Sequence, residues 1–352
     1  MRQAAGGSSR GGIVKWVLGV LIVAALAFGA SRLLGPKGPG RSTVPTSGQV
    51  DQTAVAALPA LPALPESGRI DLSAASALPP YFASGWSEKA PAGVWSSGPV
   101  ATLRLPAAAA AQDIPVVIDL SAFVPTSAVT QRVQVTSARQ PVADWSFSIG
   151  NPGGPQLLLV PASLVKNGMV ELDFAFPDAT SPADQKVSAD ARKLAIFVKS
   201  IQVGGAALTV LAPGAKVDLS KQTVLPALFS SGWSGIAAGG VWNSDRSATL
   251  TLPVGHGAKN LKVAVDASSF LPNKDYVQLV DVTVGGQPVA TWTFDSKTPA
   301  GVRTAEIPDT AVKNGVVTLE LAFPSATSPA AQKLSGDQRQ LGLFVKAISV
   351  TN

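Results

Sequence analysis

Apolar and polar residues alternate with a period of two along most of this chain. In the segments 145–149 and 170–176, every second side chain is apolar, and the positions between them are mostly Ser, Glu or Asp. Such alternation puts the apolar side chains on one face of a β-strand, so each segment is predicted to be a half-buried strand. The same pattern, or a short apolar run, predicts further strands at 102–105, 116–120, 132–135, 157–160 and 194–203.

Pro, Gly and Ser residues separate these segments at short intervals. The chain has 33 Gly and 28 Pro in 352 residues, which is typical of many turns between short strands. No segment has a useful helical period, apart from a possible short turn around 181–193. Eight or nine short strands within about 135 residues predict an antiparallel β-sandwich or jelly roll.

One long stretch of the sequence occurs twice, at an offset of 147 positions. Gly85-Trp86-Ser87 returns as Gly232-Trp233-Ser234, and the offset holds as far as Arg192 and Arg339. A repeat of this length is a whole domain, because solenoid units are shorter. We therefore predict an all-β protein with two tandem, jelly-roll-like antiparallel β-sandwiches. The first repeat covers residues 69–203, the linker 204–215 and the second repeat 216–352.

The N-terminus contains an apolar segment at residues 13–34. Its uncharged part, 16–31, is flanked by Lys15 and Arg32, whose side chains can reach the membrane surface and extend the span to about 20 residues. We interpret 13–34 as a transmembrane anchor that follows a cytoplasmic tail, 1–12. A cleaved signal peptide is the alternative, because Ala25-Leu26-Ala27 matches an A-x-A cleavage pattern. The apolar stretch continues past that site, which favours the anchor.

Residues 35–68 are rich in Pro and include three Ala-Leu-Pro units between 57 and 65. Proline at every third position disfavours helices and sheets and favours an extended stalk. With the tail in the cytoplasm, the repeats are expected on the outer side of the membrane. We predict a bacterial inner-membrane, single-pass protein with its C-terminal domains in the periplasm.

The net charge of +6 is concentrated near the predicted membrane segment, because no acidic residue precedes Asp51. We attribute it to membrane topology and expect no nucleic-acid partner. The chain lacks cysteine, which excludes disulfides, thiolate catalysis and cysteine-based zinc sites. The single histidine, His256, lies between glycines and is expected to be a solvated loop residue. No metal site and no cofactor is expected.

No catalytic motif is present, so an enzyme is not expected. The carboxylates of Glu171 and Asp173 share one face of a predicted strand, as a glycosidase pair would. Their counterparts in the second repeat are Thr318 and Glu320, so the pair is not kept, and we interpret it as a solvated strand face. A hydrolase therefore ranks last among the functions considered, and no catalytic residue is predicted.

Six of the seven tryptophans belong to the repeats. An indole ring can stack on a sugar ring, and its N–H can donate a hydrogen bond to a hydroxyl. Trp86 and Trp233 lie in Ser-Gly-Trp-Ser segments that look like loops, and they are the main candidate ligand contacts. Trp95 and Trp242 are further candidates, although their position at the start of a strand favours the core. Alternation with polar residues predicts that Trp145 and Trp292 are core residues.

A second motif follows near the end of each repeat, after Thr-Ser-Pro. It reads Ser188-Ala189-Asp190-Ala191-Arg192 in the first repeat and Ser335-Gly336-Asp337-Gln338-Arg339 in the second. The guanidinium groups of Arg192 and Arg339 can bind a carboxylate with two hydrogen bonds, either within the protein or on an acidic sugar. Asp190 and Asp337 complete the set of candidate ligand-binding residues.

The two motifs together resemble the accessory β-sandwich domain at the C-terminus of some bacterial membrane glycosyltransferases and phosphoglycerol-transferase-like proteins. Such domains are similar in build to carbohydrate-binding modules. The resemblance covers both repeats, but Ala90 and Ala237 stand where that family usually has an acidic residue. The glycosyltransferase itself is absent, so the resemblance implies a stand-alone accessory protein.

These observations lead to one functional expectation and one alternative. The chain is predicted to be a membrane-anchored, non-catalytic carbohydrate-binding or accessory subunit in bacterial envelope or exopolysaccharide synthesis and export, for example of a cellulose-like glucan. Its expected partners are a polysaccharide and the proteins of envelope polysaccharide synthesis. The alternative is a structural scaffold that binds other envelope proteins and no glycan.

Overall fold

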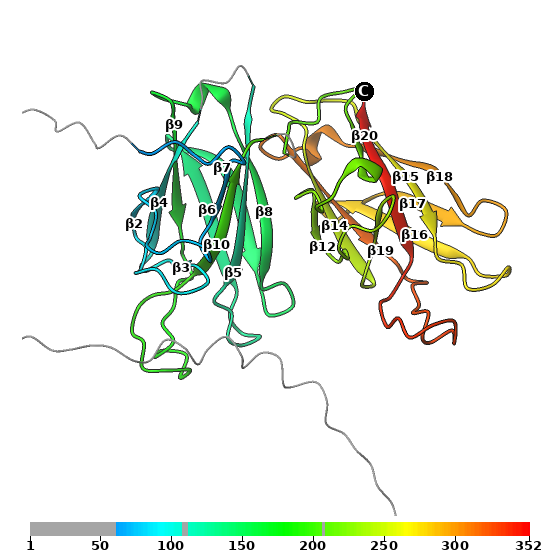
Figure 1. Cartoon of the computed structure of the whole chain (residues 1–352), viewed down its shortest axis with the longest axis horizontal. Helices are drawn as coiled ribbons and strands as arrows, with labels where there is room; N and C mark the ends of the chain where they lie inside the picture. Colours follow the sequence, from blue (N-terminus) through cyan, green and yellow to red (C-terminus); the bar gives the residue numbers. More distant parts are fainter. Residues whose placement is uncertain (1–60, 108–111, 206–207) are drawn as a thin grey trace, which may run out of the picture. The chain divides into compact units, whose positions relative to one another are not determined.

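The computed structural model describes residues 61–107, 112–205 and 208–352 (Figure 1). Among these residues, no helix is both long and apolar enough to cross a membrane. The predicted tail, 1–12, and anchor, 13–34, lie outside the described residues, as does most of the predicted stalk, 35–68. Both predicted repeats lie within the described residues, apart from positions 108–111.

The first repeat is built from ten antiparallel strands in two five-stranded sheets. Seven of these strands overlap the segments predicted from alternation or apolar runs, whereas three short strands near the start of the repeat lie outside the predicted segments. One sheet has the order β1 (Arg69–Asp71), β10 (Ile196–Val203), β5 (Ile114–Ala122) and β8 (Gly153–Val160), with β3 (Val94–Trp95) also paired to β10. The other sheet has the order β2 (Phe82–Ser84), β4 (Val100–Pro106), β9 (Met169–Ala175), β6 (Gln131–Ser137) and β7 (Gln140–Phe147).

The second repeat has the same two sheets. Its first sheet has the order β11 (Lys216–Asp218), β20 (Leu343–Thr351), β15 (Leu261–Ser269) and β18 (Ala300–Ile307), with β13 (Val241–Trp242) paired to β20. Its second sheet has the order β12 (Phe229–Ser231), β14 (Ser247–Pro253), β19 (Val316–Ala322), β16 (Gln278–Val284) and β17 (Gln287–Phe294). Among the described residues, the helices are short 3-10 turns at Ala162–Leu164, Leu219–Lys221 and Asp309–Ala311.

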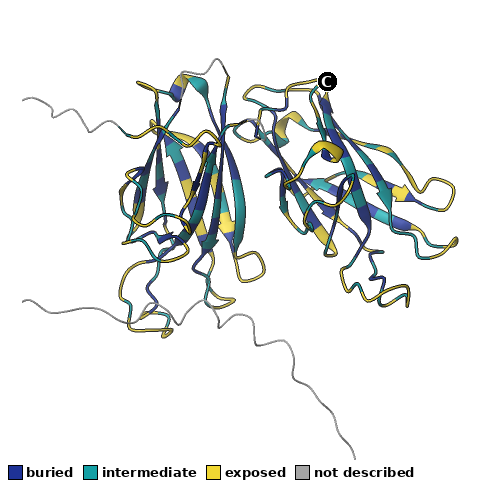
Figure 2. Ribbon diagram, viewed as in Figure 1, coloured by how far each residue is buried: buried dark blue, intermediate teal, exposed yellow. Residues whose placement is uncertain are grey.

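Each pair of sheets encloses its own apolar core, so each repeat is an antiparallel β-sandwich. Figure 2 shows buried positions alternating with intermediate or exposed ones along the strands. In β9, for example, Val170, Leu172 and Phe174 are buried, whereas Glu171 between them is exposed. The all-β, antiparallel prediction is confirmed, because the period-two pattern reports directly which side of a strand meets the core.

The hairpin turn between β16 and β17 also follows from the sequence. Gly285 and Gly286 both have positive φ angles, 57° and 77°, as a two-residue turn between paired strands requires. The first repeat makes the same turn with Ala138 and Arg139, at φ angles of 47° and 66°. The sequence of the first repeat gives no glycine signal for this turn.

Strand β8 carries apolar side chains on both of its faces. Leu158 belongs to the core of its own repeat, but Leu157 belongs to the apolar cluster of the second repeat. Leu159 is fully buried, and its Cδ2 atom lies so close to Gly315 that a Cβ atom there would be only 2.7 Å away. Strand β8 contacts β12 and β14, so the two repeats share an interface.

Candidate functional site

The two motifs singled out from the sequence meet at one end of each sandwich. The tryptophan motif consists of Gly85-Trp86-Ser87 and Gly93-Val94-Trp95. The backbone N–H of Ser87 donates to the carbonyl of Trp95 at 2.9 Å, which joins these two halves. The backbone N–H of Gly98 donates to the carbonyl of Lys193 at 2.8 Å, which brings the Asp-x-Arg segment alongside. The two motifs therefore form one structural unit at this end of the fold.

The glycines of the tryptophan motif are required by close backbone contacts. Gly85 has a φ of 75°, and a Cβ atom there would lie 2.1 Å from the carbonyl oxygen of Val100. At Gly93, a Cβ atom would lie 2.2 Å from the carbonyl oxygen of Val198. The repeated glycines thus have a structural reason that is independent of any ligand.

Trp86 is half buried and anchored at its polar end. Its Nε1 donates to the carbonyl of Thr102 at 2.9 Å, and its ring packs edge-on against Phe82, with centroids 5.2 Å apart, and against Phe174. Trp233 has a similar environment in the second repeat, where its ring packs edge-on against Phe229 and Leu321 stands in place of Phe174. Its Nε1 donates to the carbonyl of Thr249 at 2.8 Å. Both rings pack against the core of their repeat, and their role as ligand contacts stays a prediction.

Trp95 and Trp242 are also half buried, and they pack against neighbouring aromatic rings. The Trp95 ring centroid lies 5.0 Å from that of Phe197 and 6.2 Å from that of Phe123. The Trp242 centroid lies 4.9 Å from that of Phe344. These contacts explain why an aromatic residue ends the short strands β3 and β13, and a ligand role for these two rings stays a prediction as well.

Each Asp-x-Arg motif closes on itself. The Nε and Nη2 atoms of Arg192 lie 3.0 and 2.5 Å from the carboxylate oxygens of Asp190, and Arg339 pairs with Asp337 at the same distances. The hydrogen bond from the arginine lowers the pKa of each aspartate below its usual range. Each arginine guanidinium therefore already binds a carboxylate of its own loop, and the carboxylate of a ligand would have to compete with that aspartate.

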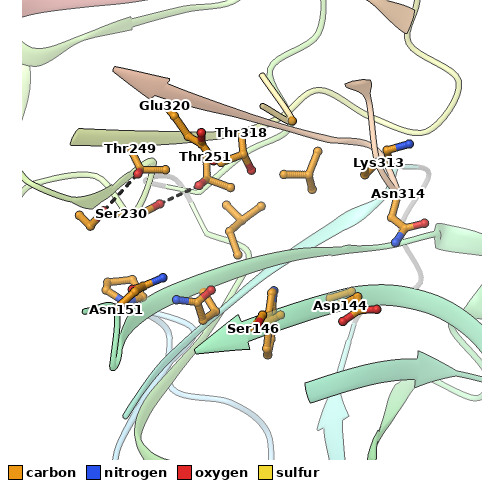
Figure 3. Close-up of a pocket in the computed structure, with 18 of the residues that line it drawn as sticks. Asp144, Ser146, Asn151, Ser230, Thr249, Thr251, Lys313, Asn314, Thr318 and Glu320 are labelled. Carbon is orange, nitrogen blue, oxygen red and sulfur yellow. Dashed lines mark hydrogen bonds between the residues drawn. The ribbon is translucent and has the colours of Figure 1, made fainter. Parts of the chain in front are cut away.

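A pocket of about 430 Å³ lies elsewhere, between the two repeats (Figure 3). The first repeat contributes the outward side chains of β7, the loop after β7 and the start of β8, including Asp144, Ser146 and Asn151. The second repeat contributes the outward faces of β12, β14 and β19 and a neighbouring turn. Its polar lining residues are Ser230, Ser231, Thr249, Thr251, Lys313, Asn314, Thr318 and Glu320.

Hydroxyl groups of the second repeat are ordered within this pocket. The hydroxyls of Ser230 and Thr251 lie 2.7 Å apart, and Ser231 donates to Thr249 at 3.1 Å (Figure 3). Only three of the lining residues, Asp144, Lys313 and Glu320, carry a charge. The lining can therefore offer many neutral hydrogen-bonding groups to a polar ligand.

Trp145 gives this pocket an aromatic component. The sequence predicts a core residue, and Trp145 does pack against the core of its repeat, but it is only half buried and also lines the pocket. Its counterpart Trp292 is 4% exposed and donates from Nε1 to the carbonyl of Thr304 at 2.8 Å. Among the described residues, none accepts a hydrogen bond from the Trp145 indole.

The pocket was not predictable from either repeat alone, because its two walls come from different repeats. The available signal was asymmetry between the copies. Charged residues of the first repeat, Arg104 and Glu171, are replaced by Thr251 and Thr318 in the pocket-facing strands of the second. Within the described residues, no group of three or more His, Asp or Glu side chains is placed to hold a metal ion.

A scan against protein-family models and a search of curated proteins gave no match. Solved structures that resemble this chain include the CBM22-1–CBM22-2 tandem domain of Paenibacillus barcinonensis Xyn10C, with 10% identity and a TM-score of 0.24. That match covers 84% of this chain and 99% of that chain. The M60 catalytic domain with CBM51-1 and CBM51-2 of Clostridium perfringens ZmpB has 11% identity over 74% of this chain, with a TM-score of 0.22. The match spans only 34% of that chain.

The extracellular domain of ANXUR1 from Arabidopsis thaliana is similar at 11% identity, over 73% of this chain and 82% of that chain, with a TM-score of 0.27. Likenesses at these scores carry no information about the site, whose chemistry depends on the residues of this chain.

Proposed function

We propose that the chain is a non-catalytic carbohydrate-binding protein and that the pocket between its repeats is the glycan site. The observation that carries this proposal is the half-buried Trp145 ring in a pocket lined by hydroxyl and amide groups. A sugar ring offers C–H groups to an aromatic ring and hydroxyls to such polar groups. The pocket volume lies within the range of about 300–1,000 Å³ that is usual for small-molecule sites.

The composition of the lining supports binding more than catalysis. Asp144 and Glu320 come from different repeats, and Glu320 accepts a hydrogen bond from Thr283 at 3.2 Å. The other carboxylate pair considered from the sequence is engaged elsewhere, because Glu171 pairs with Arg104 at 2.7 Å and Asp173 accepts from Thr102 at 2.9 Å. These arrangements favour a protein without enzymatic activity.

The proposed fold of each sandwich is a jelly roll. Successive strands from β1 to β6 alternate between the two sheets, as do β7 to β10, and only the β6–β7 hairpin stays within one sheet. Alternation of this kind is typical of a double-sheet jelly roll. It also supports the resemblance to the accessory domain of bacterial membrane glycosyltransferases.

The proposed setting is the bacterial inner membrane. Residues 13–34 form the anchor, residues 35–68 hold the repeats away from the bilayer, and the repeats lie in the periplasm. There the chain acts as an accessory subunit in envelope or exopolysaccharide synthesis and export, binding the polysaccharide and the proteins that make it. The sequence pattern of the N-terminus supports this setting.

Glycan retention of the full-length chain in a mild detergent tests the proposal, with affinity gels that contain cellulose-like and other envelope polysaccharides. Asn314→Ala removes a pocket amide, and Asn167→Ala removes its counterpart outside the pocket. Both asparagines have left-handed backbones, with φ angles of 49° and 52°, so the two changes share the same backbone cost. We expect at least a tenfold loss of affinity for Asn314→Ala alone.

Two results would contradict the proposal. The first is equal affinity of the two asparagine variants, and the second is the absence of retention of the parent chain on every glycan. A defined envelope protein that co-purifies with the parent and with the Trp145→Ala variant would then favour the protein-binding scaffold.

A further inference from the structure

The interface between the repeats uses two surfaces, and each surface exists twice in the chain. One is the outward side of β8, and the other is the outward face of β12, β14 and β19. Strand β18 is the counterpart of β8 in the second repeat, and β2, β4 and β9 form the counterpart face in the first. A second copy of the chain therefore carries the same pair of surfaces, and head-to-tail contacts of this kind build closed rings or open filaments.

We call β8 the docking strand, and its residues differ from those of its counterpart in the second repeat, β18. Leu157 and Leu159 of β8 are 6% and 0% exposed at the interface. The corresponding residues of β18 are Thr304 and Glu306, and both are exposed. The Glu306 carboxylate pairs with Nζ of Lys262 at 3.3 Å. The free strand thus has polar and charged groups at the two positions where the buried strand has leucine.

We call the outward face of β12, β14 and β19 the receiving face. Its counterpart in the first repeat is likewise more polar. Thr251 is 9% exposed and belongs, with Thr318, to the face that meets the first repeat. At the corresponding positions of the first repeat stand Arg104 and Glu171, whose Nε and Oε2 atoms are 2.7 Å apart. The free face therefore carries an ion pair where the covered face carries two threonines.

Both differences oppose a contact between β18 of one chain and the free face of β2, β4 and β9 of another. To dock β18 on the free face, the chain would have to remove Glu306 and the Arg104–Glu171 pair from water. The loss of hydration of such groups commonly exceeds what the new contacts return. Charged side chains on exposed sheet surfaces are a known means of preventing association of this kind.

We propose that Arg104, Glu171, Thr304 and Glu306 are specificity residues that restrict the interface to the two repeats of one chain. The surfaces on β8 and on β12, β14 and β19 recognise each other, and the two free counterparts reject a second copy. Within one chain, each buried surface is covered by the other repeat, and the two free counterparts carry polar or charged groups instead. This inference does not depend on what the pocket binds.

Two half-grafts test the proposal in the full-length chain in detergent. The variant Arg104→Thr/Glu171→Thr gives the first repeat the receiving face of the second. The variant Thr304→Leu/Glu306→Leu gives the second repeat the docking strand of the first. Each variant alone is expected to sediment like the parent, whereas an equimolar mixture is expected to form a 1:1 complex. A single chain with all four changes is expected to form larger assemblies as its concentration rises.

The result that overturns the proposal is a mixture that sediments as separate chains, with both variants folded by circular dichroism and thermal melting. Association of the parent chain through β18 would overturn it equally. If a graft does not fold, the reverse change, Leu157→Thr/Leu159→Glu, places the residues of β18 in β8. We then expect faster hydrogen exchange in β8 and not in β18, and unchanged exchange in β8 would reject the proposal.

Discussion

The Nδ1 atom of His256 lies 2.7 Å from Oδ2 of Asp113, and this pair links the second repeat to the first. The backbone N–H of His256 donates to the same oxygen at 3.0 Å, and the N–H of Ala162 donates to Oδ1 at 3.2 Å. The solvated loop residue expected from the sequence is thus one third exposed and bound to a carboxylate. The sequence carries no signal for this pair, since its members are 143 positions apart.

Asp113→Ala is expected to lower the free energy of unfolding by about 1–3 kcal/mol, because up to three N–H groups lose their acceptor. Burial raises the pKa of the Asp113 carboxyl, but hydrogen bonds from His256 and Ala162 outweigh it, so the pKa falls below its ordinary value of 3.8. The stabilisation is therefore complete above pH 3.8 and is lost as the pH falls through the lower pKa of the folded state. Chemical denaturation of the parent and of Asp113→Ala, from neutral pH to below pH 3.8, measures this stabilisation.

The matched control is Asn260→Ala, since Asn260 is the counterpart of Asp113 in the second repeat. Asn260 lacks a carboxylate, so the difference between parent and control is expected to stay constant with pH. If the parent and Asp113→Ala differ equally at neutral pH and at strongly acidic pH, the carboxylate does not act as described.

Trp292→Phe is expected to cost more stability than Trp145→Phe, by about 1–2 kcal/mol. Trp292 is buried and donates to the Thr304 carbonyl, so its replacement removes both packing and a hydrogen bond. Trp145 lines the pocket, and its replacement leaves no carbonyl of the described residues without a donor. Urea denaturation of the two variants measures the difference, and equal losses would mean that the environments of the two rings are alike.

The comparison of the repeats shows what sequence patterns can and cannot predict. Alternation places Val170, Leu172 and Phe174 in the core, because a strand exposes its two faces in a strict order. It also predicts a core position for Trp145, although the half-buried ring lines a pocket. The second wall of that pocket comes from residues such as Thr251, and no local pattern encodes which repeat covers which face. Only differences between the copies, such as Thr251 against Arg104, mark the covered surface.

Ala138→Gly/Arg139→Gly is expected to stabilise the first repeat by about 0.5–1 kcal/mol. Both residues adopt positive φ angles in the β6–β7 turn, a conformation that costs energy for residues with a Cβ atom. The gain is reduced because glycine loses more backbone entropy on folding. Thermal melting of the variant tests the expectation.

The opposite change in the second repeat, Gly285→Ala/Gly286→Arg, is the control for this prediction. It installs the first-repeat turn between β16 and β17 and is expected to lower stability by a similar amount. Stabilisation by both exchanges would show that the turn sequences are tuned to contacts other than the backbone angles.

Ser96→Ala is expected to destabilise the first repeat by about 2–4 kcal/mol, although it removes a single oxygen. The Ser96 side chain is fully buried, and its Oγ accepts from the backbone N–H groups of Ala195 and Ile196 at 3.0 and 3.1 Å. Alanine would leave both donors buried without a partner, at a cost of about 1–3 kcal/mol for each.

In the second repeat, Asn243 accepts the corresponding pair of backbone hydrogen bonds. Two substitutions of Asn243 can therefore test how much each of its hydrogen-bonding groups contributes. Its Oδ1 accepts from Gly342 and Leu343 at 2.8 and 2.7 Å, and its Nδ2 donates to the carbonyls of Asp245 and Gln340. Asn243→Ser keeps an acceptor and loses the two donated bonds, whereas Asn243→Ala loses both functions. Chemical denaturation should therefore rank the parent above Asn243→Ser and Asn243→Ser above Asn243→Ala. Equal instability of the two variants would show that a serine oxygen cannot replace the asparagine at this position, and that the two repeats have diverged in their buried polar groups as well as on their surfaces.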